Sequence, residues 1–197
     1  HDLILDALIN RDKAGWNELP RRIVKKYGGD VTTKGLTNKE PLPNYLAPLA
    51  EKVYNDFLIS QMPNHMLING YSAGDGIMPH TDGPSYHPEV VCLNLGSSRV
   101  LSFWKDQQAV RNNEYLARIY CEPRSVVMFS DVFYKEHLHG VEYVTEENLS
   151  NDESDPETFI NNWTHISIPL GCTPTKIPLT ATRYSITIRH ATPCSCE

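Results

Sequence analysis

Residues 69–84 read NGYSAGDGIMPHTDGP, and the apolar run Met66-Leu67-Ile68 comes directly before them. The apolar run predicts a strand, and the glycine-rich residues 72–76 predict a turn that presents an extended segment carrying His80 and Asp82. Side chains two residues apart on an extended segment leave on the same face, so these two can meet one ion. An imidazole and a carboxylate are two of the three ligands in the facial triad that holds non-heme Fe(II). A His-x-Asp pair alone is more often a polar strand edge or turn than a metal site.

The third ligand of such a triad has to come from a distant part of the chain. His139, within Leu138-His139-Gly140, is the natural candidate. His137 lies two residues earlier and points to the same side of an extended strand. Spacing alone therefore leaves both histidines open.

Four motifs occur along the chain in a fixed order. They are Asn69-x-Tyr71, His80-x-Asp82, His139 and the pair Arg183-x5-Arg189. This order resembles the AlkB family of Fe(II)/2-oxoglutarate-dependent dioxygenases, and the likeness extends from about residue 58 to residue 189. It is greatest for the sixth AlkB-homologue branch, through GIMPHxDGP at 76–84 and EPRS at 122–125.

The resemblance implies a division of labour among these residues. It selects His139 over His137 as the third Fe(II) ligand. Arg183, helped by the Tyr71 hydroxyl, would hold the distal carboxylate of 2-oxoglutarate, while Arg189 and Asn69 would lie nearer its metal-bound end. Such enzymes use O2 to convert 2-oxoglutarate to succinate and CO2 while they oxidise a substrate carbon. An N-methyl substrate would be demethylated with release of formaldehyde.

The length and composition predict one compact domain. The chain has 197 residues, 40% of them apolar, which is enough for one well-packed core and few for two. We expect residues 1–64 to form N-terminal helices and a substrate lid, and residues 65–190 to form a mainly β core with an acidic insert at 142–169. Many short strands after early helices are typical of a sandwich or a barrel. The resemblance narrows this to the double-stranded β-helix, a jelly-roll and cupin-like core.

The overall charge and the cysteines bear on partners and compartment. A net charge of −6 excludes binding of nucleic acid through bulk charge, so such binding needs a local basic patch. No apolar run is long enough for a membrane-spanning helix. The cysteines are odd in number and scattered, which indicates free thiols in a reducing compartment, so we expect a cytoplasmic or nuclear monomer. They are Cys92, Cys121, Cys172, Cys194 and Cys196.

Local patterns predict the individual elements. Apolar periodicity predicts a helix over residues 2–10 and another over about 48–57. Strands are predicted at 90–95 and 100–104, joined as a hairpin, followed by a loop over 105–118. The first half of the acidic insert has few apolar residues, and we expect it to be mobile.

A basic and aromatic segment precedes the core. Two interpretations of it stay open: a mobile lid that stacks on and neutralises a substrate, or a solvated strand pair with ordinary surface lysines. Tyr86 is likewise either a residue that stacks on substrate or a loop aromatic beside Pro88. The segment consists of Arg21, Arg22, Lys25 and Lys26 with Trp16 and Tyr27 on either side.

The substrate is less well defined than the iron site. We predict a nucleic-acid base, preferably in a single strand, because a base must leave the duplex stack before it can be oxidised. A protein side chain is the alternative substrate, and a cupin-like binding module with little activity is the rival to an enzyme. The bacterial DNA-repair member of the family carries Lys-Asp-Glu after its His-x-Asp, whereas this chain carries Gly83-Pro84-Ser85. The departure leaves the iron site intact and the specificity for a base open.

Overall fold

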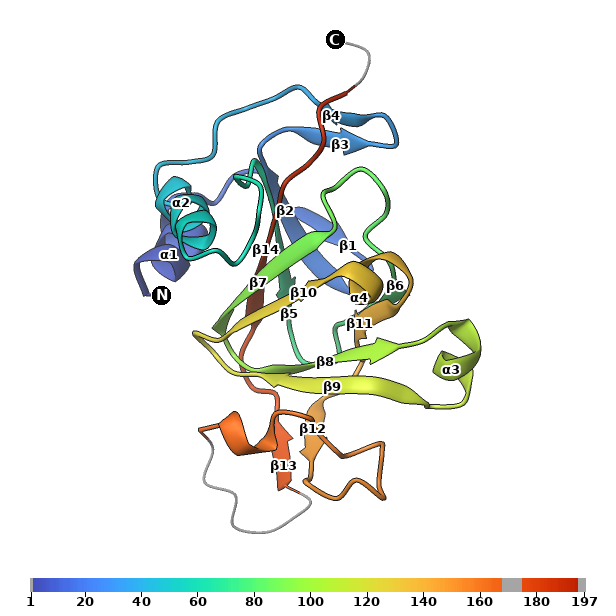
Figure 1. The fold of residues 1–197 in the computed structure, drawn as a ribbon. Helices are drawn as coiled ribbons and strands as arrows, with labels where there is room; N and C mark the ends of the chain where they lie inside the picture. The colour runs from blue at the N-terminus through green and yellow to red at the C-terminus, as the bar shows by residue number, and fades with distance from the viewer. Residues whose placement is uncertain (1, 168–174, 195–197) are drawn as a thin grey trace.

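Two antiparallel sheets face each other across the middle of the molecule (Figure 1), in a computed structural model that describes residues 2–167 and 175–194. The larger sheet has the order β1 (Asn17–Leu19), β2 (Arg22–Tyr27), β5 (His65–Tyr71), β14 (Arg183–Arg189), β7 (Glu89–Gly96) and β10 (Val126–Ser130). The smaller has the order β6 (Ile77–His80), β11 (Leu138–Val141), β8 (Arg99–Trp104) and β9 (Tyr115–Cys121). This arrangement confirms the mainly β, jelly-roll core. Cys172, Cys196 and the last two residues of the acidic insert lie outside the described residues.

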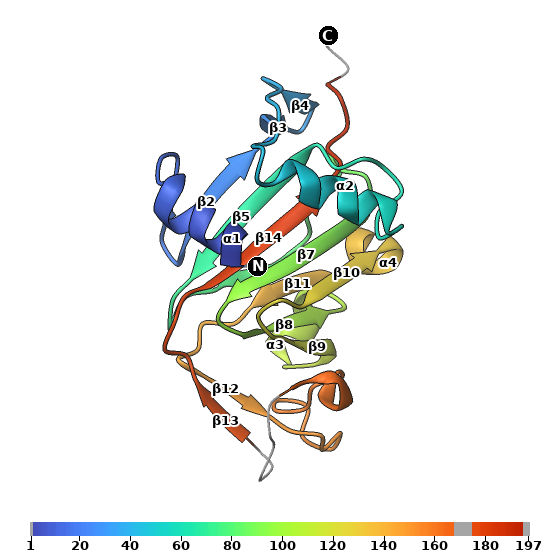
Figure 2. The same cartoon turned by 90° about the vertical axis from the view of Figure 1, so that its left-hand side faces the viewer.

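Alternation along β14, a central strand of the larger sheet, gives that sheet two unlike faces. Ile186 and Ile188 are fully buried on the outer face. There they pack in a cluster with residues of the N-terminal helices such as Leu8 and Val53. These helices are α1 (Asp2–Asp6), which continues into the π-helical turn η1 (Ala7–Arg11), and α2 (Ala47–Asn55), and they cover this face in Figure 2. The predicted helices are confirmed, with Pro48 in the first turn of α2, where its missing N–H costs nothing.

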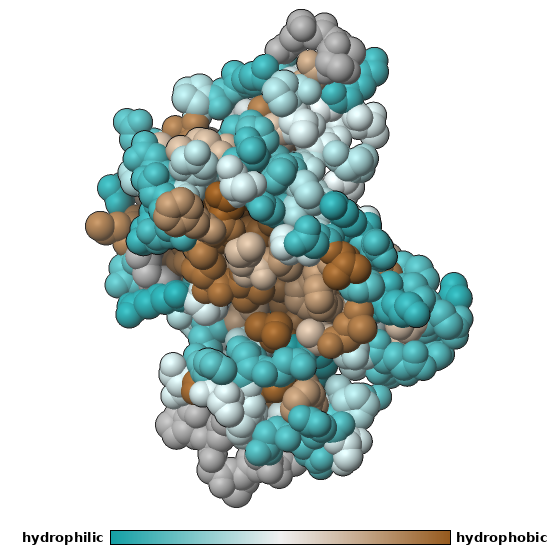
Figure 3. All heavy atoms as spheres, in the orientation of Figure 1, coloured by the Kyte–Doolittle hydropathy of each residue, from teal (hydrophilic) through white to brown (hydrophobic). Residues whose placement is uncertain are grey.

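The inner face of the larger sheet is more polar. It meets the smaller sheet through a second cluster that includes Tyr71, Cys92, Phe103 and Phe129. A groove lined by apolar side chains opens beyond this cluster, between the edge strands β9 and β10 (Figure 3). Phe103 and Phe129 line the groove on one side and pack against the His139 ring on the other, with centroids 6.1 and 4.9 Å away. The two rings therefore separate the groove from the polar interior.

The predicted hairpin over residues 90–104 is wrong. β7 pairs with β14 and β10 in the larger sheet, whereas β8 pairs with β11 and β9 in the smaller. The two-residue link between them carries the chain from one sheet to the other. Buried Arg99 anchors the crossing by donating to the carbonyls of Ser72 and Val144.

The predicted loop over residues 105–118 is also wrong in part. It contains the helix α3 (Gln107–Arg111) and the first half of β9. The Asp106 carboxylate caps α3 by accepting from the backbone N–H groups of Gln108 and Ala109. Such a cap satisfies donors that a short helix leaves free.

The first half of the acidic insert contains a short strand, although the sequence predicted a mobile segment. β12 (Glu146–Leu149) pairs with β13 (Thr175–Pro178). Leu149 is fully buried in a small cluster with Val100, Tyr120 and Ile160. The buried Glu147 carboxylate accepts from the Val100 N–H at 2.9 Å. A few well-placed apolar residues thus anchor an otherwise acidic segment.

A further hairpin, β3 (Asp30–Thr32) and β4 (Gly35–Thr37), follows β2.

Candidate metal centre and cosubstrate cavity

Cross-strand pairing brings the predicted triad together. His139 on β11 lies opposite His80 on β6, and their ring centroids are 4.5 Å apart. Asp82 follows β6, and its Oδ1 lies 3.9 Å from His80 Nε2 and 4.0 Å from His139 Nε2. One ligand atom from each residue lies within 4.8 Å of the others. The three side chains can therefore hold a single cation.

His137, the competing third ligand, lies apart from this group. Its ring packs against Phe133, and its Nδ1 lies 3.4 Å from the carbonyl oxygen of Lys105. Within residues 2–167 and 175–194, the only group arranged to hold a metal is the one that contains His139.

The protonation of the triad suits a metal. Burial, outweighing the nearby Asp82 charge, lowers the pKa of His139 to about 4, so its imidazole is neutral near pH 7. Burial alone would raise the pKa of Asp82, but the charges of Arg189, His139 and His80 bring it below its usual value. The Nδ1 of His80 lies 2.9 Å from the Met78 carbonyl, a contact that directs Nε2 toward Asp82. Two imidazole nitrogens and one carboxylate are the donor set that Fe(II) accepts in such triads.

The four residues expected at 2-oxoglutarate line the same cavity as the triad. Strands β14 and β5 pair so that Arg183 lies opposite Tyr71 and Ser185 lies opposite Asn69. The side chains of these residues therefore share the inner face of the larger sheet. The cavity is lined by Asn69, Tyr71, His80, Asp82, His139, Arg183 and Arg189, with apolar and small polar neighbours.

The cavity has a positive charge available for an anion. Arg183 is 2% exposed, and its guanidinium donates through Nε to Asn94 Oδ1 at 3.2 Å and lies over the Tyr71 ring. In the described parts of the chain, no carboxylate forms an ion pair with it. A buried cation without a counter-ion is costly, so the site fits a carboxylate ligand. Burial raises the pKa of Tyr71 to about 12, which keeps its hydroxyl a donor.

Other atoms in the cavity also have no protein partner. Buried polar atoms without a hydrogen bond include Asn69 Oδ1, Asp82 Oδ2, His139 Nδ1 and Arg189 Nε. Buried polar groups are normally satisfied, so this concentration marks a place where a ligand completes the structure. Asn94, whose carboxamide holds Arg183, was not predicted. Its polar side chain at i+2 from Cys92 within an apolar strand was the available signal.

Comparisons with known proteins decide the family. The model of the 2OG-Fe(II) oxygenase superfamily matches residues 9–189. This chain belongs to that superfamily. It is 30% identical to "Probable RNA/DNA demethylase ALKBH6" of Danio rerio, over 96% of this chain and 79% of that one.

Solved structures agree on the fold. "The structure of OsALKBH1" matches at a TM-score of 0.56 and 14% identity, over 96% of this chain and 91% of that one. A 2OG-Fe(II) oxygenase family oxidoreductase from Burkholderia pseudomallei matches at a TM-score of 0.51 and 13% identity, over 94% of this chain and 75% of that one.

The present chain is a 2-oxoglutarate-dependent dioxygenase, and its membership of the superfamily implies Fe(II), 2-oxoglutarate and O2. When bound, these supply an oxidant strong enough to attack a C–H bond, while the protein orients the reactants and limits access of water.

The basic segment of this oxygenase is a strand pair, and only some of its residues face the cavity. β2 pairs with β5, and Val24 and Lys26 lie opposite Asn69 and Leu67. Alternation therefore places Arg22, Val24 and Lys26 on the inner face. Arg22 Nε is buried without a partner, while Lys26 forms an ion pair with Asp30.

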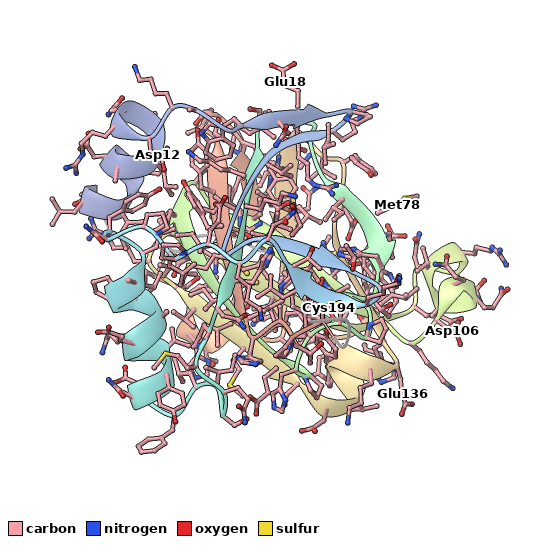
Figure 4. The ribbon with its side chains drawn as sticks, turned by 90° about the horizontal axis from the view of Figure 1, so that it is seen from above. Asp12, Glu18, Met78, Asp106, Glu136 and Cys194 are labelled. Carbon is pink, nitrogen blue, oxygen red and sulfur yellow. The ribbon has the colours of Figure 1, made fainter. Side chains whose placement is uncertain are left out.

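Three of the predicted substrate residues point the other way, and their prediction is wrong. Lys25 is 4% exposed and forms an ion pair with Asp12 at 2.5 Å. Tyr27 donates to the same carboxylate at 2.7 Å, and Trp16 packs against Tyr184. Figure 4 shows Asp12 beside α1, on the opposite side of the molecule from Met78 of β6. These three side chains therefore pack on the helix-covered face of the larger sheet, where they contact Asp12 or Tyr184, and they do not reach the cavity.

The last two predicted substrate residues, Arg21 and Tyr86, each contact another side chain of the protein. Arg21 is exposed, and its guanidinium lies over the Tyr143 ring at 5.6 Å. The Tyr86 ring packs on Arg189, with the guanidinium carbon 4.0 Å from its centroid. One face of Tyr86 is thus occupied by the protein itself and is not offered to a substrate.

Proposed function

We propose that this oxygenase demethylates or hydroxylates an alkylated base in single-stranded nucleic acid. The observation that carries the proposal is the direction of β2. Arg22 and Lys26 project from the face of the larger sheet that bears Asn69 and is turned toward the metal ligands of the smaller sheet, although the chain as a whole is acidic. The similarity to a probable RNA/DNA demethylase over nearly the full chain supports the same substrate class.

The proposed arrangement divides the substrate between two environments. The phosphates of an unpaired strand lie along Arg21, Arg22 and Lys26, and the base enters the opening of the cavity toward His80. Within the cavity we assign Fe(II) to His80, Asp82 and His139, and 2-oxoglutarate to Arg183, Arg189, Asn69 and Tyr71. The His80 side chain is 32% exposed, so this side of the metal site is open to solvent. We assign the approach of the substrate carbon to this side.

The test combines turnover and binding. The protein is incubated with Fe(II), ascorbate, 2-oxoglutarate and methylated single-stranded RNA or DNA, and formaldehyde and succinate are measured together. Binding of the same oligonucleotides is measured at two salt concentrations, because each neutralised phosphate releases counterions and steepens the salt dependence.

Matched variants locate the binding surface. Changing Arg21, Arg22 and Lys26 to Ser should weaken oligonucleotide binding by more than tenfold and flatten its salt dependence. The control changes Lys52, Arg124 and Lys176 to Ser, which removes the same charge from exposed, ion-paired positions elsewhere. Equal losses in both triple variants, or no binding at low salt, would reject this surface. Turnover of a methylated peptide in place of nucleic acid would then identify a protein substrate.

We also propose that the protein acts as a monomer in the cytoplasm or nucleus. Cys92, Cys121 and Cys194 are free and buried, which suits a reducing compartment. Imaging of a tagged chain and its sedimentation mass would test the two statements separately.

A further inference from the structure

Arg189 is held between a carboxylate and an aromatic ring. Its Nη1 lies 2.9 Å from Asp82 Oδ1, and its guanidinium carbon lies 4.0 Å from the centroid of the Tyr86 ring. The side chain is 3% exposed, and its Nε has no partner. An aromatic ring stacked on a guanidinium restrains it through cation–π attraction. The N–H groups point outward in the plane of the guanidinium, so the ring does not accept hydrogen bonds from them. The contact with Tyr86 therefore orients Arg189 while leaving donors free.

The backbone fixes Tyr86 to the strand that carries Arg189. Tyr86 forms an antiparallel bridge with Ala191, two residues beyond Arg189. On either side of the bridge, Thr192 N–H donates to the Ser85 carbonyl at 2.9 Å, and His87 N–H donates to the His190 carbonyl at 2.8 Å. These contacts fix the backbone of Tyr86 beside the segment that follows Arg189.

The buried His65 ring lies beside Tyr86. His65 is the cross-strand partner of Arg189 on β5, is 3% exposed, and lies 5.6 Å from Tyr86 between ring centroids. Tyr86 is half-buried, and its ring contacts both His65 and Arg189. A carboxylate in the place of this ring would compete with an anionic ligand for the Arg189 donors.

We propose that Tyr86 is a positioning residue for 2-oxoglutarate. It holds the Arg189 guanidinium in one orientation beside Asp82, so that the free donors face the metal-side end of the cosubstrate before it binds. Preorganisation of this kind lowers the entropy lost on binding. The inference rests on the use of 2-oxoglutarate by the superfamily and on the assignment of Arg189 to this ligand, and it does not depend on the nature of the oxidised substrate.

The test measures 2-oxoglutarate binding without turnover. Protein loaded with Mn(II) is titrated with 2-oxoglutarate by calorimetry for the parent, Tyr86→Phe and Tyr86→Leu. Loss of a desolvated cation–π contact should weaken binding by roughly tenfold in Tyr86→Leu. Tyr86→Phe keeps the ring and should bind within about twofold of the parent. In turnover assays the same loss should appear as a higher KM for 2-oxoglutarate at an unchanged kcat.

Tyr115→Leu is the matched control. Its ring is stacked on buried Arg118, with 5.0 Å between the guanidinium carbon and the centroid, on a strand of the smaller sheet. This variant removes an equivalent contact and should leave 2-oxoglutarate affinity unchanged. If Tyr86→Leu does not fold, Tyr86→Gln takes its place with the same expectation.

Three results would overturn the proposal. The first is binding of 2-oxoglutarate by Tyr86→Leu as tight as that of the parent. The second is equal weakening in Tyr86→Phe, which would assign the effect to the hydroxyl, and the third is equal weakening in Tyr115→Leu, which would assign it to general destabilisation.

Discussion

The two faces of the larger sheet are built from the same strands, but one packs against the N-terminal helices and the other lines the metal and cosubstrate cavity. On β14, Ile186 and Ile188 point to the helices and are fully buried among apolar side chains. Arg183 and Arg189 point to the cavity and are nearly as deeply buried, yet Arg189 Nε has no protein partner and Arg183 has no ion-paired carboxylate among the described residues. The helix-covered face is complete as it stands, whereas the cavity face needs a ligand. Substitutions on the first face should therefore cost stability, and those on the second should cost binding.

The largest effect is expected at the metal ligands. His139→Ala removes one of three ligands and should weaken Mn(II) binding by more than about a hundredfold. His137→Ala is the matched control and should leave binding nearly intact, because its ring lies outside the triad. Calorimetric titration with Mn(II) measures both variants. Loss of metal binding in His137→Ala with retention in His139→Ala would reverse the assignment.

Neighbouring residues on β14 offer the sharpest contrast between the faces. Ile186→Ala leaves a hole in the fully buried cluster and should lower the free energy of unfolding by about 2–5 kcal/mol. Ser185→Ala, one residue away on the cavity face, should change it by less than about 1 kcal/mol. Urea denaturation compares the two variants, and a similar loss in both would show that the faces do not differ in this way.

Arg183→Leu should separate ligand affinity from stability. The distal carboxylate of 2-oxoglutarate would lose its charged partner, at a cost on the order of 3 kcal/mol, so affinity should fall by roughly two orders of magnitude. Stability should change little, since the buried charge has no counter-ion in the free protein. Calorimetry with Mn(II)-loaded protein tests the affinity. Unchanged affinity would mean that a different cation holds the ligand.

The smallest effect concerns pH. Burial, together with the charges of Arg189 and Lys26, lowers the pKa of His65 to about 4 from its ordinary 6.5. Between these values the unfolded chain binds a proton that the folded protein does not, so stability rises as the pH increases from 4 to 6.5 and is then level. Urea denaturation of the metal-free protein should show a shallower rise for His65→Phe than for the parent, and an identical pH profile would contradict the buried, neutral His65.

The sequence was sufficient where function depends on spacing of two along a strand. His80 and Asp82, and the six-residue interval from Arg183 to Arg189, place side chains on one face whatever the rest of the fold. Spacing could not choose between His137 and His139, because both have the same parity. The family resemblance selected His139, and the cross-strand register with β6 gives the structural reason.

Long-range pairing also explains the errors. Lys25 and Lys26 are adjacent and equally basic, and the register of β2 on β5 decides that one meets Asp12 and the other the cavity side. The link between β7 and β8 has the local sequence of a hairpin turn, and the partners that send these strands to different sheets lie far along the chain. The acidic insert was misjudged because a few buried apolar residues, Leu149 and Ile160 among them, are enough to dock it.

The central claim is that the cavity binds Fe(II) and 2-oxoglutarate and couples them to O2. The most direct measurement is succinate release during aerobic incubation with Fe(II), ascorbate and 2-oxoglutarate, without added substrate, for the parent and for Asp82→Ala. We predict slow but clear succinate formation by the parent and none above background by Asp82→Ala. Equal background rates for both proteins, in samples shown by calorimetry to bind metal in the parent, would contradict the claim and favour a binding module with this fold.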